Sequence, residues 1–288
     1  MNKELELELI EQVKADPLSL KDIKDQTEKI CLEAVKLNSL ALEYVIDQTE
    51  EICLEAVKRN GAILGYVKNK TESICLEAVK QNGNALDYVR NQTEEICLEA
   101  VKQNGYALCF VKDQTEAICL AAVKRNAHSL EYVRNQTKEV CLEAVKEDGN
   151  ALFYVRNQTE DICLEALKQN GFAIRHVKNQ TIELCLEAVK QDGKALMHTN
   201  YKTDDIYKEA LKSNFSSAVQ LIDIKQKSNA IIVLKASLLY PKDKTILTSI
   251  IEEFNEDKDV VDFYTKYQLW KHVDFNVLNK LTQYGMTL

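Results

Sequence analysis

The sequence predicts an all-α fold, namely an α-solenoid of about ten 22-residue two-helix repeats closed by a C-terminal helical cap. Three observations lead to this prediction. A threonine recurs every 22 residues without insertion or deletion, its apolar neighbours have helical spacing, and the wording decays only in the outermost units. A strict period of this kind is typical of elongated repeat proteins. The threonines of the series are Thr27, Thr49, Thr71, Thr93, Thr115, Thr137, Thr159, Thr181 and Thr203.

The outer units keep the 22-residue register but lose many of the residues that the other repeats share. Before Thr27, Leu9 and Val13 occupy the positions that the cysteine and valine of later units hold. After the last threonine, Ile206 is retained, whereas Tyr207 stands at the cysteine position. Terminal units of an array are commonly atypical, because they face solvent on one side. We therefore assign residues 1–224 to the solenoid.

The first half of each unit has the signals of an α-helix. In the unit from Thr93, this residue is a suitable N-cap, and the acidic pair after it favours the positive end of the helix dipole. Asn104 and Gly105 predict a left-handed stop, which leaves a helix of about eleven residues. The apolar side chains between these signals fall at i, i+1, i+4 and i+5, as Ile96, Cys97, Ala100 and Val101.

The second half of the unit predicts a shorter helix. From Tyr106 to Asp113 the apolar stripe is brief, and so few residues make a stable helix, α or 3₁₀, only when packed against a neighbour. A small residue beside the leucine would let the two helices approach closely. It recurs as Ala41, Ala85, Ala107, Ser129, Ala151, Ala173 and Ala195.

Eight of the nine cysteines share one register of the repeat. Neighbouring helices in a stack lie roughly 8–10 Å apart, which is too far for a disulfide or for two thiolates on one zinc ion. We therefore expect buried, reduced cysteines that fill space, and Cys109 lies outside this row. The row consists of Cys31, Cys53, Cys75, Cys97, Cys119, Cys141, Cys163 and Cys185.

The phrase ICLEAVKQNG followed by ALxYV, over about residues 27–199, resembles the repeat family called domain of unknown function 4116. That family is known chiefly from giant viruses of amoebae, from amoebae and from amoeba-associated bacteria. The resemblance implies a helical repeat and the setting of a viral protein. It supplies no catalytic residues to carry over.

Residues 225–288 do not repeat and predict a helical bundle that caps the array. The apolar stripes predict four helices, with Pro241 as a breaker and Asp243, Asp257 and Asp274 as caps, over residues 228–240, 243–254, 257–272 and 274–285. Aromatic residues are concentrated here, so the bundle could also serve docking or dimerisation. They are Phe254, Phe263, Tyr264, Tyr267, Trp270, Phe275 and Tyr284.

The positions that vary between repeats are those expected to carry specificity. The registers of Tyr106 and Cys109 vary most, and beside them lies an aromatic row that starts at Tyr44 and ends in His176 and His198. We therefore expect a non-enzymatic protein–protein interaction scaffold that binds a peptide or protein along the short-helix face. The candidate residues are Tyr106, Cys109, Phe110, Phe153, Tyr154, Phe172, Arg175, His176 and Met197.

A single-stranded RNA-binding repeat protein is the alternative. Its support is a row of basic side chains next to the aromatic row, and its difficulty is an acidic chain of net charge −8. The C-terminal 64 residues hold nine lysines against eight acids, so the acidity resides in the repeats. This basic row is Lys68, Arg90, Lys112, Arg134, Arg156 and Lys178.

Other classes of function find little support in the sequence. The four histidines His128, His176, His198 and His272 have no metal-ligand spacing, and no phosphate loop or nucleophile motif is visible. We therefore expect no enzyme activity, no cofactor and no metal. The acidic N-terminus is unlike a secretion signal, and no stretch approaches the roughly 18 apolar residues of a membrane span. We expect a cytoplasmic protein, in the host cytoplasm if the chain is viral.

Overall fold

The computed structural model describes residues 2–239, 244–254, 257–267 and 269–272. Within these residues every regular element is a helix. A ten-residue α-helix followed by a six-residue 3₁₀ helix recurs from Glu28 to His198. The predicted all-α solenoid is therefore confirmed, and the second helix, for which the sequence left two forms open, is 3₁₀.

The α-helices of the array are α1 (Lys3–Ala15), α2 (Glu28–Leu37), α3 (Glu50–Arg59), α4 (Glu72–Gln81), α5 (Glu94–Gln103), α6 (Glu116–Arg125), α7 (Lys138–Glu147), α8 (Glu160–Gln169), α9 (Ile182–Gln191) and α10 (Asp204–Ser213). The 3₁₀ helices that alternate with them are η1 (Pro17–Asp22), η2 (Ser39–Tyr44), η3 (Gly61–Tyr66), η4 (Gly83–Tyr88), η5 (Gly105–Phe110), η6 (Ala127–Tyr132), η7 (Gly149–Tyr154), η8 (Gly171–His176) and η9 (Gly193–His198). The remaining helices are α11 (Phe215–Ala218), η10 (Val219–Leu221), α12 (Lys227–Ser237), α13 (Lys244–Glu253), α14 (Lys258–Lys266) and η11 (Leu269–His272).

The chain forms two compact units. The first comprises Met1–Glu147 and Tyr154–Arg156, and the second comprises Asp148–Phe153 and Asn157–Leu288. The boundary between the two compact units therefore falls within the repeats, whereas the repeated sequence pattern ends at residue 224.

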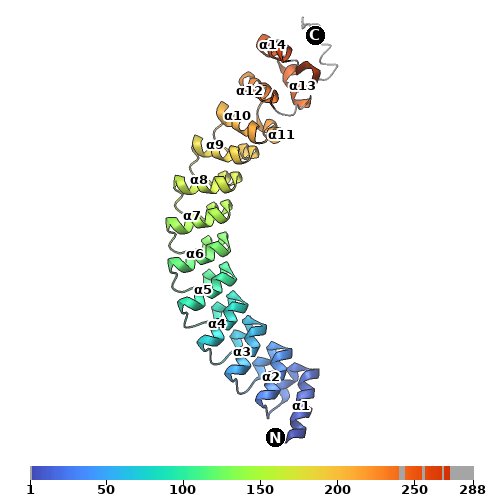
Figure 1. The fold of residues 1–288 in the computed structure, drawn as a ribbon, viewed down its shortest axis with the longest axis vertical. Coiled ribbons are helices and arrows are strands. Elements are labelled where there is room, and N and C mark those ends of the chain that lie inside the picture. The colour runs from blue at the N-terminus through green and yellow to red at the C-terminus, as the bar shows by residue number, and fades with distance from the viewer. Residues whose placement is uncertain (1, 240–243, 255–256, 268, 273–288) are drawn as a thin grey trace. The chain divides into compact units, whose positions relative to one another are not determined.

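Within the first unit the repeats are stacked in chain order, as Figure 1 shows for α1 to α7. Consecutive α-helices contact one another, and so do consecutive 3₁₀ helices, so that the unit has two layers. The core lies between the layers. In the repeat of α5, it is built from the predicted stripe around Ile96 and Val101 together with Ala107 and Leu108 of η5, all of which are buried. The register of Ala107 is buried in every short helix of the array from η2 on, and it accommodates Ile63 in η3 as well as the small residues of the other repeats.

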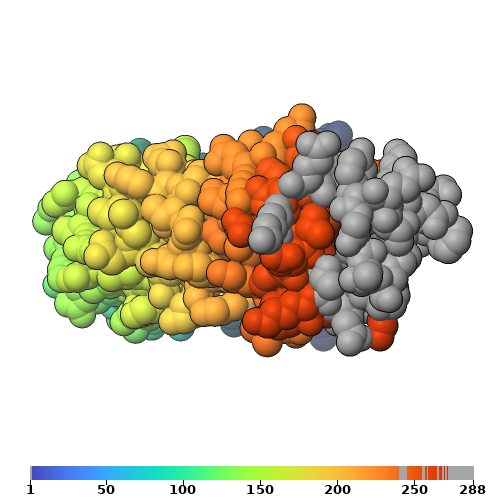
Figure 2. Space-filling view, turned by 90° about the horizontal axis from the view of Figure 1, so that it is seen from above, coloured from blue at the N-terminus to red at the C-terminus, as the bar shows by residue number. Residues whose placement is uncertain are grey.

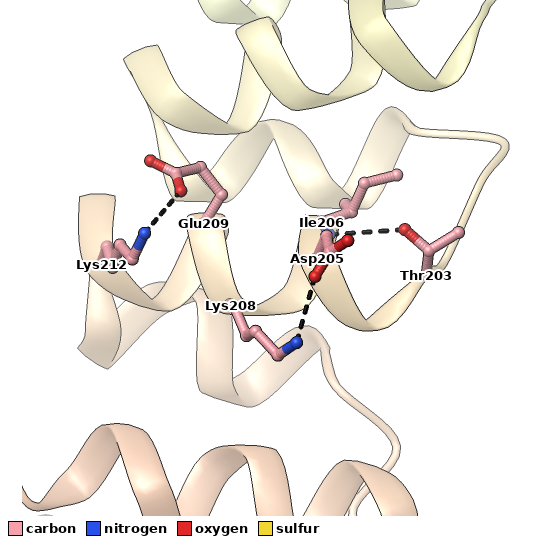
Figure 3. A network of polar contacts seen from close by, with 6 residues as sticks. All are labelled: Thr203, Asp205, Ile206, Lys208, Glu209 and Lys212. Carbon is pink, nitrogen blue, oxygen red and sulfur yellow. Dashed lines mark hydrogen bonds and ion pairs between the residues drawn. The ribbon is translucent and has the colours of Figure 1, made fainter.

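The threonine of the repeat caps its α-helix as predicted in eight of the nine threonine-led repeats, the exception being Thr159 at α8. Thr93 Oγ1 accepts a hydrogen bond from the backbone N–H of Ile96 at 3.4 Å. Figure 3 shows the same cap at α10, where Thr203 accepts from the N–H of Ile206. The outer face of that helix carries the ion pairs Asp205–Lys208 and Glu209–Lys212, at 3.0 and 2.9 Å. These pairs are exposed and contribute only a few tenths of a kcal/mol each.

The left-handed stop predicted at Asn104 and Gly105 is wrong. Asn104 has extended backbone angles, φ −143° and ψ 108°, and its side chain caps η5 by accepting from the N–H of Tyr106. The glycine is favoured for another reason. A Cβ at Gly105 would lie 2.6 Å from the carbonyl oxygen of Ala122 in the next repeat. Glycine at this register therefore permits close contact between repeats.

In seven repeats, a glutamine directly before the threonine joins neighbouring repeats through both ends of its amide. Gln136 Nε2 donates to the carbonyl oxygens of Leu130 and Tyr154, at 3.1 and 2.9 Å. Its Oε1 accepts from the backbone N–H of Arg156 at 2.9 Å and from the thiol of Cys141 at 3.9 Å. All eight cysteines of the row are buried and unpaired, whereas Cys109 is exposed. The predicted packing role of the row is confirmed, and the thiol also donates to the amide.

In the second unit the non-repeating helices continue from the last repeat, and Figure 2 shows its successive segments in chain order. Helix α12 packs against α10, the α-helix of the last repeat, and so covers that end of the array. Lys227 forms ion pairs with Asp257 and Asp259, both at 2.8 Å. Asp257 also caps α14, as predicted, by accepting from the N–H of Val260. Pro241, Asp243, Asp274 and the helix predicted over 274–285 lie outside the described residues.

Candidate functional site on the short-helix face

The 3₁₀ helices position the two most variable registers side by side. In η5, Gly105, Ala107 and Leu108 are buried against the α-helices, whereas Tyr106 and Cys109 are exposed. Side chains three apart are eclipsed along a 3₁₀ helix. Tyr106 and Cys109 therefore share one outer edge, and the equivalent residues of each repeat form a continuous short-helix face within each unit.

Four candidate residues belong to the first unit. Tyr106 is 39% exposed, Cys109 is exposed, and Phe110 and Tyr154 are half-buried. The ring of Tyr106 meets that of Tyr132 edge to face, with centroids 6.1 Å apart. The imidazole of His128 meets the ring of Tyr154 at 5.5 Å. A ring at the variable register thus packs against the aromatic row of the next repeat.

The other five candidates belong to the second unit. Phe153 and Met197 stand at the same register and are 63% and 57% exposed, and Arg175, which lies between them in the series, is exposed too. Phe172 and His176 are half-buried. The phenyl ring of Phe153 meets the imidazole of His176 at 5.3 Å in an edge-on arrangement. This unit therefore presents more exposed apolar surface at the variable register than the first.

Arg175 and His176 form the main polar contact of the second-unit face. The Nε of Arg175 donates to His176 Nε2 at 3.0 Å, and its NH2 group donates to Asn150 Oδ1 at 3.4 Å. Partial burial lowers the pKa of His176 from its ordinary value of 6.5, and the nearby charges of Arg175 and His198 lower it further. His176 is therefore neutral at pH 7 and serves as a hydrogen-bond acceptor.

Ring pairing across repeats was missed by the sequence reasoning. Besides the pairs above, Phe172 packs edge-on against His198 with centroids 6.0 Å apart. A signal was present, because aromatic residues recur 26 positions apart at 106 and 132, 128 and 154, and 172 and 198. Stacking of repeats thus accounts for part of the aromatic content of the face. It leaves most of Phe153 and Met197 in solvent.

The basic row has a structural use that the sequence did not reveal. Arg134 donates from its guanidinium to the carbonyl oxygens of Val111 and Lys112, and Arg156 does the same to Val133 and Arg134. Lys68 donates to the carbonyls of residues 45 and 46, and Lys112 to that of residue 90. These guanidinium and ammonium groups join one repeat to the preceding one. The backbone N–H of Lys178 donates to Gln158, and the side chain of Arg90 makes no bond to a described residue.

Two pockets lie beside the basic row in the first unit. One, of about 400 Å³, is lined by Lys68, Lys70, Cys75, Arg90 and neighbouring residues. The other, of about 310 Å³, is lined by the corresponding Lys112, Gln114, Cys119 and Arg134 with their neighbours. Both lie between consecutive loops that precede α-helices.

The part of the chain that the structure describes contains neither a group of side chains suited to a metal ion nor a helix suited to a membrane. No cluster of three or more His, Cys, Asp or Glu side chains is arranged to hold a metal ion there. None of the helices so described is both long and apolar enough to cross a bilayer.

The aromatic residues of the C-terminal helices contribute to packing. Burial raises the pKa of Tyr264, whose hydroxyl donates to the carbonyl oxygen of Leu247. Phe263 and Tyr267 pack with ring centroids 4.6 Å apart. Phe275 and Tyr284 lie outside the described residues, so the docking role suggested for this segment stays a prediction.

Comparison with known proteins addresses the repeats. A family model described as domain of unknown function (DUF4116) matches the chain five times, over residues 49–93, 74–116, 93–138, 116–159 and 137–181. No curated protein and no solved structure gives a significant match. The matched windows overlap and advance by about one repeat each, in agreement with the structural period. The chain therefore contains repeats of the DUF4116 type over residues 49–181.

Proposed function

We propose that the protein is a non-enzymatic interaction scaffold that binds a peptide or protein partner along the short-helix face. The repeat architecture supports a scaffold, because stacked repeats offer extended surfaces for partners. The observation that carries the proposal is the exposure of Phe153 and Met197 at the most variable register of the second unit.

The fold does not require large apolar side chains at this register. The same position holds Glu43, Asp87 and Glu131 in repeats with the same helices. The ring of Phe153 meets the imidazole of His176 edge-on, and most of the surface of Phe153 remains in water. Full burial of such a side chain is worth about 1.5–3 kcal/mol. A partner with apolar side chains would gain this energy without disturbing the stack.

Single-stranded RNA is the alternative that the basic row suggested. Phosphate recognition requires cationic heads that can reach the ligand. The heads of Arg134 and Arg156 donate instead to backbone carbonyls of the preceding repeat. The arrangement therefore favours a protein or peptide partner.

The cytoplasmic location is part of the same proposal. The exposed thiol of Cys109 and the unpaired buried cysteine row suit a reducing compartment. If the chain has the viral setting that its resemblance implies, this compartment is the host cytoplasm.

The test uses peptides selected on the intact protein from a displayed random library. Their affinities are then measured for a double variant, Phe153→Ala with Met197→Ala. We expect the melting temperature to change little, because both side chains are exposed, and binding to weaken by about 2 kcal/mol or more, as at interface anchors.

A double variant elsewhere provides the matched control. Leu37 and Ile46 are 56% and 54% exposed and lie away from the short-helix registers. Leu37→Ala with Ile46→Ala should leave peptide affinity unchanged. Peptides that bind the Phe153 and Met197 variant as tightly as the native protein would refute the proposal.

A further inference from the structure

Two repeats, those of Thr71 and Thr203, depart from the glutamine contacts that join the others, because Lys70 and Lys202 stand in place of glutamine. In seven repeats of the array, a glutamine Oε1 accepts the backbone N–H of the residue 20 positions later, at 2.8–2.9 Å. Position 70 holds lysine instead, which has no acceptor. The glutamines that make this contact are Gln26, Gln48, Gln92, Gln114, Gln136, Gln158 and Gln180.

The substitution leaves two donors without the oxygen that they have elsewhere. The backbone N–H of Arg90 is the group that a glutamine at position 70 would bind, and it has no acceptor among the described residues. The thiol of Cys75 likewise has no acceptor there, as is also true of Cys163, whereas the other six thiols of the row donate to glutamine oxygens. An acceptor is thus missing at a defined point between two repeats.

Lys70 also displaces the side chain of Arg90. Its ammonium donates to the carbonyl oxygen of Val67 at 2.7 Å. That carbonyl has the register of Val111 and Val133, which Arg134 and Arg156 bind in later repeats. Because Lys70 occupies the carbonyl of Val67, the guanidinium of Arg90 makes no hydrogen bond or ion pair with a described residue. Two cationic groups therefore border one pocket, and one of them is uncommitted.

The pocket of about 400 Å³ described above is lined by these groups. Lys70 is half-buried, Cys75 is buried and Arg90 is exposed, so the cavity opens to solvent on the arginine side. Lys68 adds a third cation, although its ammonium already donates to two carbonyls. Glu72 is the acidic side chain in the lining, so the lining has a net positive charge.

The second pocket is a natural comparison, because it has the same registers with glutamine in place. There the Oε1 of Gln114 accepts from the N–H of Arg134 at 2.9 Å, and the guanidinium of Arg134 binds carbonyls. It is lined by Asp113 and Glu116 as well as by basic residues. The missing acceptor and the uncommitted arginine thus belong to the Lys70 pocket.

We propose that the pocket between Lys70 and Arg90 is a binding site for a phosphate-class oxyanion. One anion oxygen takes the place of the missing amide oxygen and accepts the N–H of Arg90, while the ammonium and the guanidinium neutralise the charge. Charge-assisted bonds of this kind are about twice as strong as neutral ones. A water molecule could accept the N–H but would not compensate two neighbouring cations. The volume leaves room for a group esterified to the phosphate.

The test is a titration of the intact protein with inorganic phosphate, followed by the backbone ¹H–¹⁵N resonances at constant ionic strength. We expect saturable shifts at the N–H of Arg90, and none at the N–H of Arg134, which already has its acceptor. Sodium chloride at matched ionic strength controls for screening. A parallel titration with glycerol phosphate distinguishes a free phosphate site from one that also contacts an ester group, which would bind the ester more tightly.

Lys70→Gln is the decisive variant, since it supplies the amide oxygen that other repeats use. Its melting temperature should be equal to or above that of the native protein, so lost binding cannot be ascribed to unfolding. We expect its phosphate affinity to fall at least tenfold. The reverse change, Gln114→Lys, should create phosphate-dependent shifts at Arg134. Absence of saturable shifts at Arg90, or equal phosphate affinity in Lys70→Gln, would overturn the proposal.

Discussion

At the scale of single residues, the cysteine row is matched to the glutamines that precede it in seven repeats. A thiol is small enough for the buried register and can still donate weakly to an amide oxygen. Six of the eight thiols in the row do so, at 3.4–3.9 Å. Burial was predictable from the repeated register. The bonds of the same amide to the adjoining repeat were not predictable, because their partners lie 18–20 residues apart in the chain.

Thiol reactivity tests this arrangement. Burial raises the pKa of each thiol in the row, to about 11 for Cys31, against an ordinary value of 9.0. In native protein at pH 8, we expect a thiol reagent to label Cys109 rapidly and the row slowly, as mass spectrometry of digested protein would show. Rapid labelling of Cys97 or Cys141 in folded protein would contradict the packing role.

The same pKa shift sets the sign of a pH effect on those thiols. The folded chain keeps the proton of Cys31 at pH values where the unfolded chain releases it. The stabilisation from this thiol is therefore complete below about pH 9 and is lost as the pH rises through its folded pKa of about 11. Labelling of the row should accelerate over the same interval.

At the scale of one element, the short helix shows how a six-residue segment holds its conformation. Asn104 caps it, Ala107 and Leu108 fix its buried side, and Gly105 lets it contact the next repeat. The sequence indicated a helix here but left its type open, since periodicity over so few residues does not distinguish α from 3₁₀. The glycine was misread because Asn-Gly commonly ends helices in a left-handed conformation.

Gly83→Ala tests the close contact between repeats. A Cβ there would lie 2.4 Å from the carbonyl oxygen of Ala100, so the next repeat must shift. Ala127 occupies this register in another repeat, which indicates that the stack can adjust. We expect a loss of about 1–3 kcal/mol in the free energy of unfolding, measured by urea denaturation.

Gly65→Ala is the control, because a Cβ at Gly65 would meet only the ring of Tyr88, at 3.3 Å. It should change stability much less than Gly83→Ala. Equal effects of the two changes would show that contact with the next repeat does not determine the cost.

At the scale of the whole molecule, the period made the fold predictable and left the partner unknown. Thr27 to Thr203 set the repeat length without any structure, and the helices follow that spacing. The candidate face was also located from the variable registers of Tyr106 and Cys109. What those registers bind depends on a second molecule whose chemistry the chain does not contain. The exposure of Phe153 became evident only in three dimensions.

The chain's charge leads to a prediction about nucleic acid. With net charge −8 and the heads of Arg134 and Arg156 bonded to carbonyls, we expect no RNA binding at about 150 mM salt. Fluorescence anisotropy of a labelled single-stranded oligonucleotide would measure it. Sub-micromolar, salt-sensitive binding that Arg134→Ala with Arg156→Ala abolishes would reverse the choice of partner class.

The contacts that join neighbouring repeats also bear on how the chain folds during its synthesis. The bonds of the glutamines and of the basic heads to the adjoining repeat span 18–23 residues. Sequence separation between contacting groups therefore does not grow as repeats are added, and folding rate depends strongly on that separation. Each helix meets its neighbour once about one further repeat has left the ribosome. The array can thus consolidate in the order of translation, without waiting for its C-terminal end.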